Sequence, residues 1–251
     1  MNIVIVGASG FIGSYLVEHL SKDHKVIPIY KDTVNVFDSN EVGMFLWKNG
    51  AGIVINCLSF GEGNGNNSED VGKNLALFYS FYANQDLFKH YINIGSGSEK
   101  TKNNSAYAFS KKLISASMFG PKWFNLIVYG CFGKNEKPRR LLKQFLSSKG
   151  KFKIQNDRLF DFISIQDFAN IVSAVVENTN DRYIPHTIVC TYESKIKIST
   201  FLSMFCDINN IEKRYEVESE SEDSYTGYSN LHEVPGLNLY GIGHGMKEYI
   251  I

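Results

Sequence analysis

The feature that most constrains this chain is a short apolar segment that ends in a glycine-rich turn. Ile3 to Val6 is a β-branched run, and Gly7, Gly10 and Gly13 follow it in the sequence GASGFIG. Apolar residues at helical spacing begin at Phe11. Such glycines permit a tight turn, close approach of the backbone to a pyrophosphate and close helix–strand packing, while the helix N-terminus offers N–H donors. The arrangement predicts a dinucleotide site made of Gly7, Ser9, Gly10, Phe11, Ile12 and Gly13.

Strand-like and helix-like segments alternate over the first 130 residues. The predicted strands are 3–6, 25–30, 53–57, 91–94 and 124–129. The predicted helices lie near 40–48, 69–85 and 106–119. This alternation predicts an α/β fold with a Rossmann-type, doubly wound parallel sheet.

The pattern loosens after Gly133. It predicts a helix over 138–146, a strand over 160–165, a helix over 166–177, a strand over 187–190 and a last helix near 245–249. Because domains average about 150 residues, 251 residues fit one large domain or a core with an appendage. We therefore expect a Rossmann core over 1–133 and a small substrate-binding region over 134–251. The Gly/Asn-rich segment 61–68 and the Glu/Ser-rich segment 216–224 are expected to be irregular.

Charge and composition exclude several classes of protein. Lys+Arg and Asp+Glu both number 26, so no basic excess indicates a nucleic-acid partner. The sequence has no apolar stretch of about 18 residues, so no membrane span is expected. The four cysteines are far apart and form no CxxC pair, which predicts reduced thiols, no metal site and a cytoplasmic protein.

A second motif lies just after the predicted strand 91–94. Tyr107 and Lys111 form a YxxxK pair, and one helical turn places both side chains on the same face of a helix. A nearby ammonium favours the phenolate form of a tyrosine, which suits general acid/base chemistry. Two hydroxyls, Ser96 and Ser98, follow the strand.

With the GASGFIG turn and the YxxxK pair, the chain resembles the extended short-chain dehydrogenase/reductase family, in its branch acting on nucleotide sugars. The segments VYG at 128–130 and DFISIQDFA at 161–169 resemble further motifs of that family. The resemblance implies that Ser96 holds the substrate carbonyl oxygen, with Ser98 in reserve. It also implies that Tyr107 transfers the proton, and that Lys111 stabilises the phenolate and binds the nicotinamide ribose.

Cofactor choice is expected at the end of the second predicted strand. An acidic side chain there accepts from the ribose 2′-OH of NAD, and a basic one pairs with the 2′-phosphate of NADP. Tyr30 and Lys31 occupy the place and favour NADP. Asp32 follows directly and leaves NAD possible.

The resemblance also bears on the substrate. Arg139, Arg140 and Arg158 lie where relatives hold the nucleotide diphosphate, and guanidinium groups suit that dianion. Dehydratases of the branch carry a Thr-Asp-Glu set, of which only Glu99 remains here, displaced by one position. Epimerase–reductases carry a cysteine where this chain has Ser98.

These features predict NAD(P)H-dependent reduction of a 4-keto nucleotide-linked deoxysugar, in the synthesis of surface-polysaccharide precursors. The alternatives are a nucleotide-sugar 4-epimerase and a non-catalytic dinucleotide sensor of the same fold. The family also implies a homodimer formed through the helices 69–85 and 106–119. Leu75, Phe78, Tyr79 and Tyr82 on the first helix favour it, because they give more aromatic surface than one buried stripe requires.

Overall fold

The computed structural model describes residues 1–61, 67–101 and 105–250, which form two compact units. Unit 1 comprises Met1–Ile127 and Val175–Ile188. Unit 2 comprises Val128–Ala174 and Val189–Ile251. Most of the loop expected over 61–68 lies outside the described residues.

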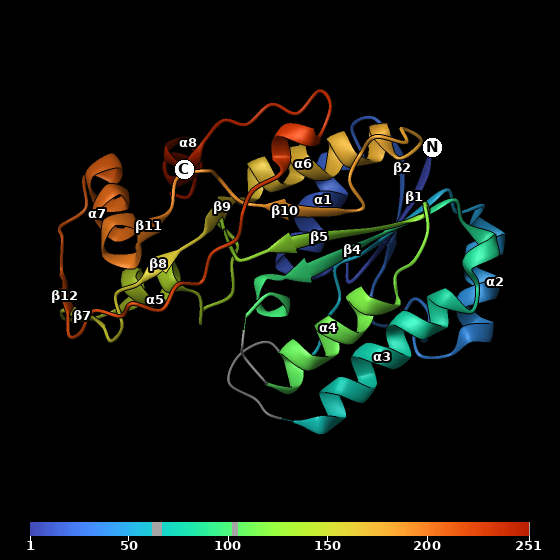
Figure 1. Cartoon of the computed structure of the whole chain (residues 1–251), viewed down its shortest axis with the longest axis horizontal. Helices are drawn as coiled ribbons and strands as arrows, with labels where there is room; N and C mark the ends of the chain where they lie inside the picture. The colour runs from blue at the N-terminus through green and yellow to red at the C-terminus, as the bar shows by residue number, and fades with distance from the viewer. Residues whose placement is uncertain (62–66, 102–104, 251) are drawn as a thin grey trace. The chain divides into compact units, whose positions relative to one another are not determined.

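Unit 1 is built around a six-stranded sheet in the order β10-β5-β4-β3-β1-β2 (Figure 1). Its strands are β1 Asn2–Val6, β2 Lys25–Ile29, β3 Ile53–Asn56, β4 His90–Ser96, β5 Trp123–Val128 and β10 Thr187–Cys190. The pairs β1–β2, β1–β3 and β3–β4 are parallel. The strand order reverses at β1, with β2 on one side and β3 on the other, so the carboxyl ends of β1 and β3 form a topological switch point. The predicted Rossmann-type fold is confirmed.

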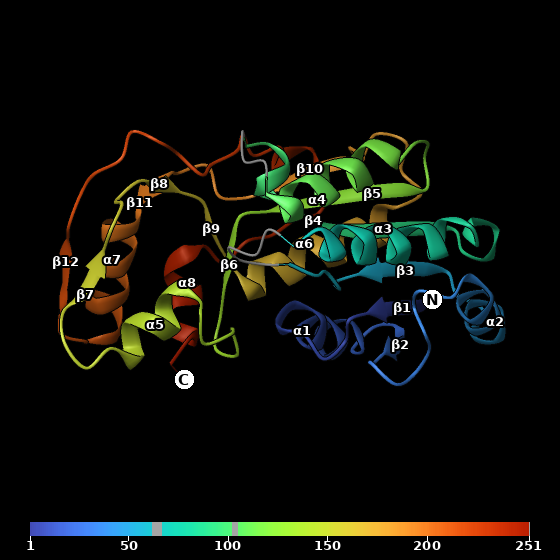
Figure 2. The ribbon, with the colours of Figure 1, turned by 90° about the horizontal axis from the view of Figure 1, so that it is seen from below.

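Helices flank this sheet. They are α1 Phe11–Leu20, α2 Ser39–Asn49, α3 Ser68–Tyr82 and α4 Ala106–Ser117, with short 3-10 turns η1 Gln85–Leu87 and η2 Gly97–Glu99. Figures 1 and 2 show α3 and α4 side by side along one face of the sheet. Val4, Val54, Phe78 and Tyr91 pack together between this face and its helices. The strands β1, β3 and β5 are almost wholly buried, as in a parallel sheet covered on both faces.

Three of the four apolar residues expected to make a dimer surface point inward instead. Phe78 is fully buried, Leu75 packs against the core, and Tyr82 stacks on Trp123 with ring centroids 5.3 Å apart. Only Tyr79 is exposed, and its hydroxyl lies 3.1 Å from Ser117 Oγ. The interpretation of this helix as carrying surplus aromatic surface is therefore wrong.

Unit 2 is assembled from short strand pairs and helices. Its strands are β6 Gly130–Phe132, β7 Phe152–Ile154, β8 Leu159–Phe160, β9 Phe162–Ser164, β11 Ile196–Lys197 and β12 Tyr215–Val217. Its helices are α5 Leu141–Ser147, α7 Ile198–Asn209, η3 Leu231–Glu233, α8 Ile242–Glu248 and most of α6 Ile165–Asn178. The pairs β6–β9 and β7–β12 are parallel and β8–β11 is antiparallel.

Several expectations for this unit are corrected. The predicted strand 160–165 is two strands, β8 and β9, separated at Asp161 and paired with different partners. The segment 216–224 is not wholly irregular, because β12 adds to β7 and Glu220 bridges to Asp157. The predicted helix 138–146 begins only at Leu141, since Pro138 to Arg140 form a turn. Helix α7 has no counterpart among the predicted elements.

Among the described residues, no helix is both long enough and apolar enough to cross a membrane.

Candidate active site

The glycine-rich turn has the geometry that its sequence predicts. Gly7 has φ +78°, a left-handed conformation that favours glycine. A Cβ on Gly13 would lie 2.2 Å from the Gly7 carbonyl oxygen, so only glycine lets α1 pack this closely on the turn. Gly10 is the N-cap of α1 and makes no side-chain cap. The turn therefore presents backbone N–H groups in the way that fits a dinucleotide pyrophosphate.

The end of β2 lies beside the glycine-rich turn, which also contains the other residues of the predicted dinucleotide site. Ser9 is exposed, and Phe11 and Ile12 are half-buried at the start of α1. Ala8 N–H donates to the Ile29 carbonyl oxygen at 3.2 Å, which fixes this turn against the last residue of β2. Tyr30 and Lys31 follow that residue and are exposed, as is Asp32. They thus follow the end of β2, where the sequence predicts contacts with a cofactor ribose.

Ser96 is the last residue of β4 and is held by its neighbours. The backbone N–H of Ser98 donates to Ser96 Oγ at 3.3 Å, and the Ser98 hydroxyl donates to the same oxygen at 2.9 Å. Because Ser96 Oγ accepts both bonds, its own hydrogen can point to another acceptor, such as a carbonyl oxygen. Ser98 thus orients Ser96.

Tyr107 and Lys111 share the first turns of α4, which packs against β4 and η2. The N-cap of this helix is Ser105, whose hydroxyl accepts from Ala108 N–H at 3.2 Å. Lys111 Nζ lies 5.8 Å from the centre of the Tyr107 ring and donates to the Ile94 carbonyl oxygen at 2.9 Å. Lys111 therefore reaches the backbone of β4 two residues before Ser96, and the Tyr107 ring lies beside this lysine.

Glu99 is a functional candidate to which the sequence analysis assigned no role. Its Oε1 accepts from Ser96 N–H at 2.7 Å and its Oε2 accepts from Asn125 Nδ2 at 2.9 Å. Burial raises the pKa of Glu99, while the charge of Lys111 and the hydrogen bonds from Ser96 and Asn125 oppose the rise. A polar residue at 125 inside an otherwise apolar strand is the sequence signal that points to this contact.

Unit 2 holds a cavity of about 200 Å³ with aromatic and cationic walls. Phe132, Phe160, Phe162 and Phe201 line it together with Glu136, Arg139 and Arg140. Arg139 is exposed, and Arg140 Nη2 donates to the Cys131 carbonyl oxygen at 2.7 Å. Arg158 is not part of the lining, but its guanidinium lies 5.9 Å from the centre of the Phe160 ring. The structure thus brings the three predicted arginines to one region of unit 2.

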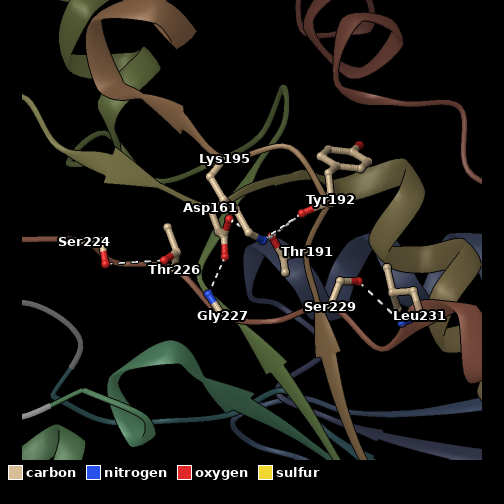
Figure 3. Close-up of polar contacts among 9 residues, drawn as sticks. All are labelled: Asp161, Thr191, Tyr192, Lys195, Ser224, Thr226, Gly227, Ser229 and Leu231. Carbon is tan, nitrogen blue, oxygen red and sulfur yellow. Dashed lines mark hydrogen bonds and ion pairs between the residues drawn. The ribbon is translucent and has the colours of Figure 1, made fainter.

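An ion pair between the buried Asp161 and the half-buried Lys195 connects segments of the chain beside this cavity (Figure 3). Lys195 Nζ lies 2.9 Å from Asp161 Oδ1 and also donates to the Tyr192 carbonyl oxygen at 2.8 Å. Asp161 Oδ2 accepts from Gly227 N–H at 2.6 Å. A Cβ on Gly227 would lie 2.5 Å from the Tyr129 hydroxyl oxygen, so the segment crosses that ring closely. None of these contacts was expected from the sequence.

Comparisons with known proteins agree with this fold. Residues 3–81 match the NAD dependent epimerase/dehydratase family. No curated protein matches the chain. Among solved structures, a GDP-mannoheptose C4 reductase from Campylobacter jejuni with NADP bound is 18% identical, with TM-score 0.79 over 99% of this chain and 96% of that one.

Two further structures widen the range of activities that share this fold. A dTDP-4-dehydrorhamnose reductase from Clostridium acetobutylicum is 17% identical, with TM-score 0.78 and coverage of 100% and 98%. A dTDP-glucose 4,6-dehydratase from Bacillus anthracis in complex with NAD is 12% identical, with TM-score 0.76 and coverage of 100% and 95%.

The whole chain therefore shares the fold of these reductases and of this dehydratase. This shared fold and the family match of residues 3–81 agree with the predicted resemblance to the extended short-chain dehydrogenase/reductase family.

Proposed function

We propose that this protein is an NAD(P)H-dependent reductase of a 4-keto nucleotide-linked sugar. The observation that carries the proposal is the arrangement at the end of β4. Ser96 Oγ accepts from Ser98, so its own hydrogen can point to another acceptor. Lys111 on α4 bonds to the same strand, with the centre of the Tyr107 ring 5.8 Å from its Nζ. Such a set is what reduction of a carbonyl group requires.

Each side chain has a separate role in the proposed reaction. When bound, a reduced nicotinamide would supply the hydride for the keto carbon. Ser96 donates a hydrogen bond to the carbonyl oxygen, where negative charge develops. Tyr107 gives its phenolic proton to that oxygen, and Lys111 stabilises the resulting phenolate. Lys111 also binds the nicotinamide ribose.

NADP is the proposed cofactor, and NAD is the alternative. The turn at Gly7 and the uncapped start of α1 suit the pyrophosphate of either. Lys31 follows β2 and is exposed, so its ammonium suits the 2′-phosphate of NADP. The heptose reductase of similar fold holds NADP, whereas the similar dehydratase holds NAD.

The cavity of unit 2 is the proposed place for the nucleotide end of the substrate. Its phenylalanine rings suit a nucleobase, and Arg139 and Arg140 suit a diphosphate. Arg158 lies outside the cavity lining, but its guanidinium is 5.9 Å from the centre of the Phe160 ring and adds a third cation beside the cavity. The similar reductases act on GDP-linked and dTDP-linked sugars, so both nucleotides belong in the test.

Dehydration is disfavoured by the engagement of Glu99. Both of its oxygens accept hydrogen bonds from within unit 1, and the side chain is buried. A carboxyl group held in this way is not available as an acid or base for a sugar. The remaining alternative within the family is a 4-epimerase, which oxidises and reduces the same carbon.

The experiment incubates the purified protein with NADPH and a panel of GDP-linked and dTDP-linked 4-keto-6-deoxyhexoses. Absorbance of the reduced nicotinamide at the end of the reaction is compared with product formed. A reductase consumes one NADPH for each sugar reduced, whereas an epimerase shows no net consumption. Failure to reduce any sugar of the panel, with NADPH bound, counts against the proposal and favours a dinucleotide sensor.

A homodimer formed through α3 and α4 is also proposed. Tyr79, Phe109 and Phe119, on or just after these helices, are exposed aromatic residues. Light scattering at micromolar concentration tests the assembly, and a monomeric mass refutes it. The cytoplasm stays the predicted compartment, and cell fractionation tests it.

A further inference from the structure

A row of buried amides crosses the sheet of unit 1 from β3 to β5. Asn56, Asn93 and Asn125 lie on three neighbouring strands, and Asn56 and Asn93 are register partners. Asn56 Nδ2 donates to Asn93 Oδ1 at 3.3 Å, and Asn93 Nδ2 donates to Asn125 Oδ1 at 2.8 Å. All three side chains are buried. Three adjacent amides in a sheet core therefore form one chain of hydrogen bonds, which we call the asparagine ladder.

The ladder ends at a backbone N–H on each side. At one end Leu58 N–H donates to Asn56 Oδ1 at 3.1 Å. The Leu58 backbone lies against the cofactor turn, since a Cβ on Gly7 would be 2.9 Å from Leu58 N. At the other end Asn125 Nδ2 donates to Glu99 Oε2, and the second oxygen of Glu99 accepts from Ser96 N–H. The ladder thus joins the cofactor turn to the serine.

The chemistry of these groups dictates what must stand at position 99. Because Leu58 N–H can only donate, Asn56 must present its oxygen to it, and each later amide is forced into the same orientation. Asn125 then turns its NH₂ group toward residue 99 and toward Ser115 Oγ, which accepts at 3.2 Å. The N–H of Ser96 also points to residue 99. Residue 99 must accept from both sides, which an ionised carboxylate does and an amide does not.

We propose that Glu99 is a positioning residue, whose ionised carboxylate closes the asparagine ladder and so fixes Ser96 relative to the cofactor turn. The catalytic importance of Ser96 rests on the proposed function, whereas the hydrogen bonds that hold this residue do not depend on it. The glycine at position 95 fits this arrangement. A Cβ there would lie 2.6 Å from both Glu99 Oε1 and Asn125 Oδ1, so a larger residue would disturb both side chains.

The surroundings of Glu99 are mixed in charge. Lys111 on α4 and Lys100 after η2 favour the ionised form, and burial opposes it. Cys57 also lies within the field of Lys111, and burial raises the pKa of this thiol to about 12, so it is neutral. Burial also raises the pKa of Glu99, so this carboxyl becomes protonated at a higher pH than an ordinary glutamic acid. Protonation places the new O–H group against a neighbouring hydrogen-bond donor.

The test uses three variants of the whole protein: Glu99→Gln, Asn125→Asp and the double variant. Glu99→Gln places an amide where two acceptors are needed. Asn125→Asp places two carboxylates against each other. In the double variant the carboxylate moves one position along the ladder. The amide introduced at position 99 then donates to the carboxylate introduced at position 125 while still accepting from Ser96, so the donors and acceptors match again.

The first readout is the amide resonance of Ser96 in ¹H–¹⁵N NMR spectra of the NADPH-bound protein. In the parent this N–H makes a charge-assisted bond, and its resonance should shift as Glu99 is protonated. The resonance should move in both single variants and return in the double variant. An unchanged resonance in Glu99→Gln overturns the proposal.

The second readout is turnover of the sugar that the panel identifies. A serine displaced by about 1 Å should lower kcat at least about tenfold in each single variant. The double variant should recover to within about threefold of the parent. NADPH affinity, measured without sugar, should stay unchanged in Glu99→Gln. A double variant no faster than Glu99→Gln overturns the proposal.

A matched control separates positioning from general stability. Asp157 in unit 2 is a buried carboxylate that accepts from Ser199 N–H at 2.9 Å and from Ser199 Oγ at 2.6 Å. Asp157→Asn should lower Tm and leave the Ser96 resonance unchanged. If the parent reduces no sugar of the panel, the proposed function fails, and the Ser96 resonance alone decides the inference.

Discussion

The two units satisfy their buried polar groups with different side chains. In unit 1 the amides Asn56, Asn93 and Asn125 connect neighbouring strands. In unit 2 carboxylates accept backbone N–H groups from segments far along the chain. Asp161 accepts from Gly227, and Asp167 accepts from Tyr240 and Gly241.

The difference follows from what each group does chemically. An amide both donates and accepts, so it can continue a row of hydrogen bonds across a sheet. A carboxylate only accepts, so it collects N–H groups that no strand partner satisfies. The loops at Gly227, Tyr240 and Gly241 are therefore held by single carboxylates, whereas the amides of the ladder depend on the register of their strands. We expect single substitutions to unfold unit 2 more readily, and to affect chemistry in unit 1.

The largest expected effect comes from Lys195→Met. Asp161 is 1% exposed and Lys195 is 23% exposed, so the substitution leaves a carboxylate buried without its cation. Breaking such a pair should lower the free energy of unfolding by about 3–5 kcal/mol. Urea unfolding measures it, and NADPH affinity should change little because the cofactor turn belongs to unit 1.

Lys197→Met is the matched control for that substitution. Lys197 lies 3.1 Å from Glu220, but the two side chains are 40% and 72% exposed. Water screens such a pair, so its loss should cost less than about 1 kcal/mol. Equal losses in the two variants would contradict the role assigned to Asp161 in holding the segment at Gly227.

Tyr107→Phe should show the opposite behaviour, a loss of chemistry at constant stability. Removing the proton donor should lower kcat at least about a hundredfold, the usual size of a lost general acid. Stopped-flow or steady-state NADPH oxidation measures it, with NADPH affinity as the internal check. Tyr79→Phe, which removes an exposed hydroxyl bonded to Ser117, should leave kcat unchanged. Near-parental turnover in Tyr107→Phe would remove this residue from the mechanism.

Lys31→Glu tests the cofactor preference at the edge of unit 1. Exchanging an ammonium for a carboxylate should weaken NADPH binding by about 1–3 kcal/mol and leave NADH binding nearly unchanged. Both dissociation constants are measured at one ionic strength, because salt screens the contact. Lys48→Glu on α2 is the control. A parent that binds NADH more tightly than NADPH would refute the assignment, and selective loss of NADH in Asp32→Ala would name Asp32 instead.

The smallest effect concerns Glu136, a carboxyl of unit 2 with one side-chain donor, the Tyr249 hydroxyl at 3.0 Å. Burial raises the pKa of Glu136 above its usual range. A raised pKa in the folded state means that stability is lost as pH rises through it. The Tm of Glu136→Gln should therefore equal that of the parent at about pH 4 and be slightly higher than that of the parent at neutral pH. A Tm difference that does not change with pH would contradict the burial of the charge.

The sequence predicted unit 1 better than unit 2, and particular elements show why. The run Ile3–Val6 and the glycines after it specify a strand, a turn and a helix through local sterics alone. Strand β10 was likewise predicted at its observed bounds, 187–190. The prediction of one strand over 160–165 missed the interruption at Asp161. That interruption depends on contacts with Lys195 and Gly227, which are distant in sequence. Helix α7 carries Phe201, Leu202, Phe205 and Cys206 at helical spacing, and this pattern was a usable signal.

For the site, the sequence by itself determined which residue types are present and how they are spaced: the glycine turn, the hydroxyl after β4 and the YxxxK pair. Each of these acts through neighbours within one or two turns of chain, so the sequence contains the information. The tertiary structure decided that Glu99, which is already bonded locally to Ser96, also meets Asn125, and that three asparagines from separate strands form one ladder. The contacts of Asn125 and of the ladder are the long-range ones. Those contacts exist only after the strands pair in one register, because a side chain cannot meet a partner 26 or more residues away until the sheet brings them together.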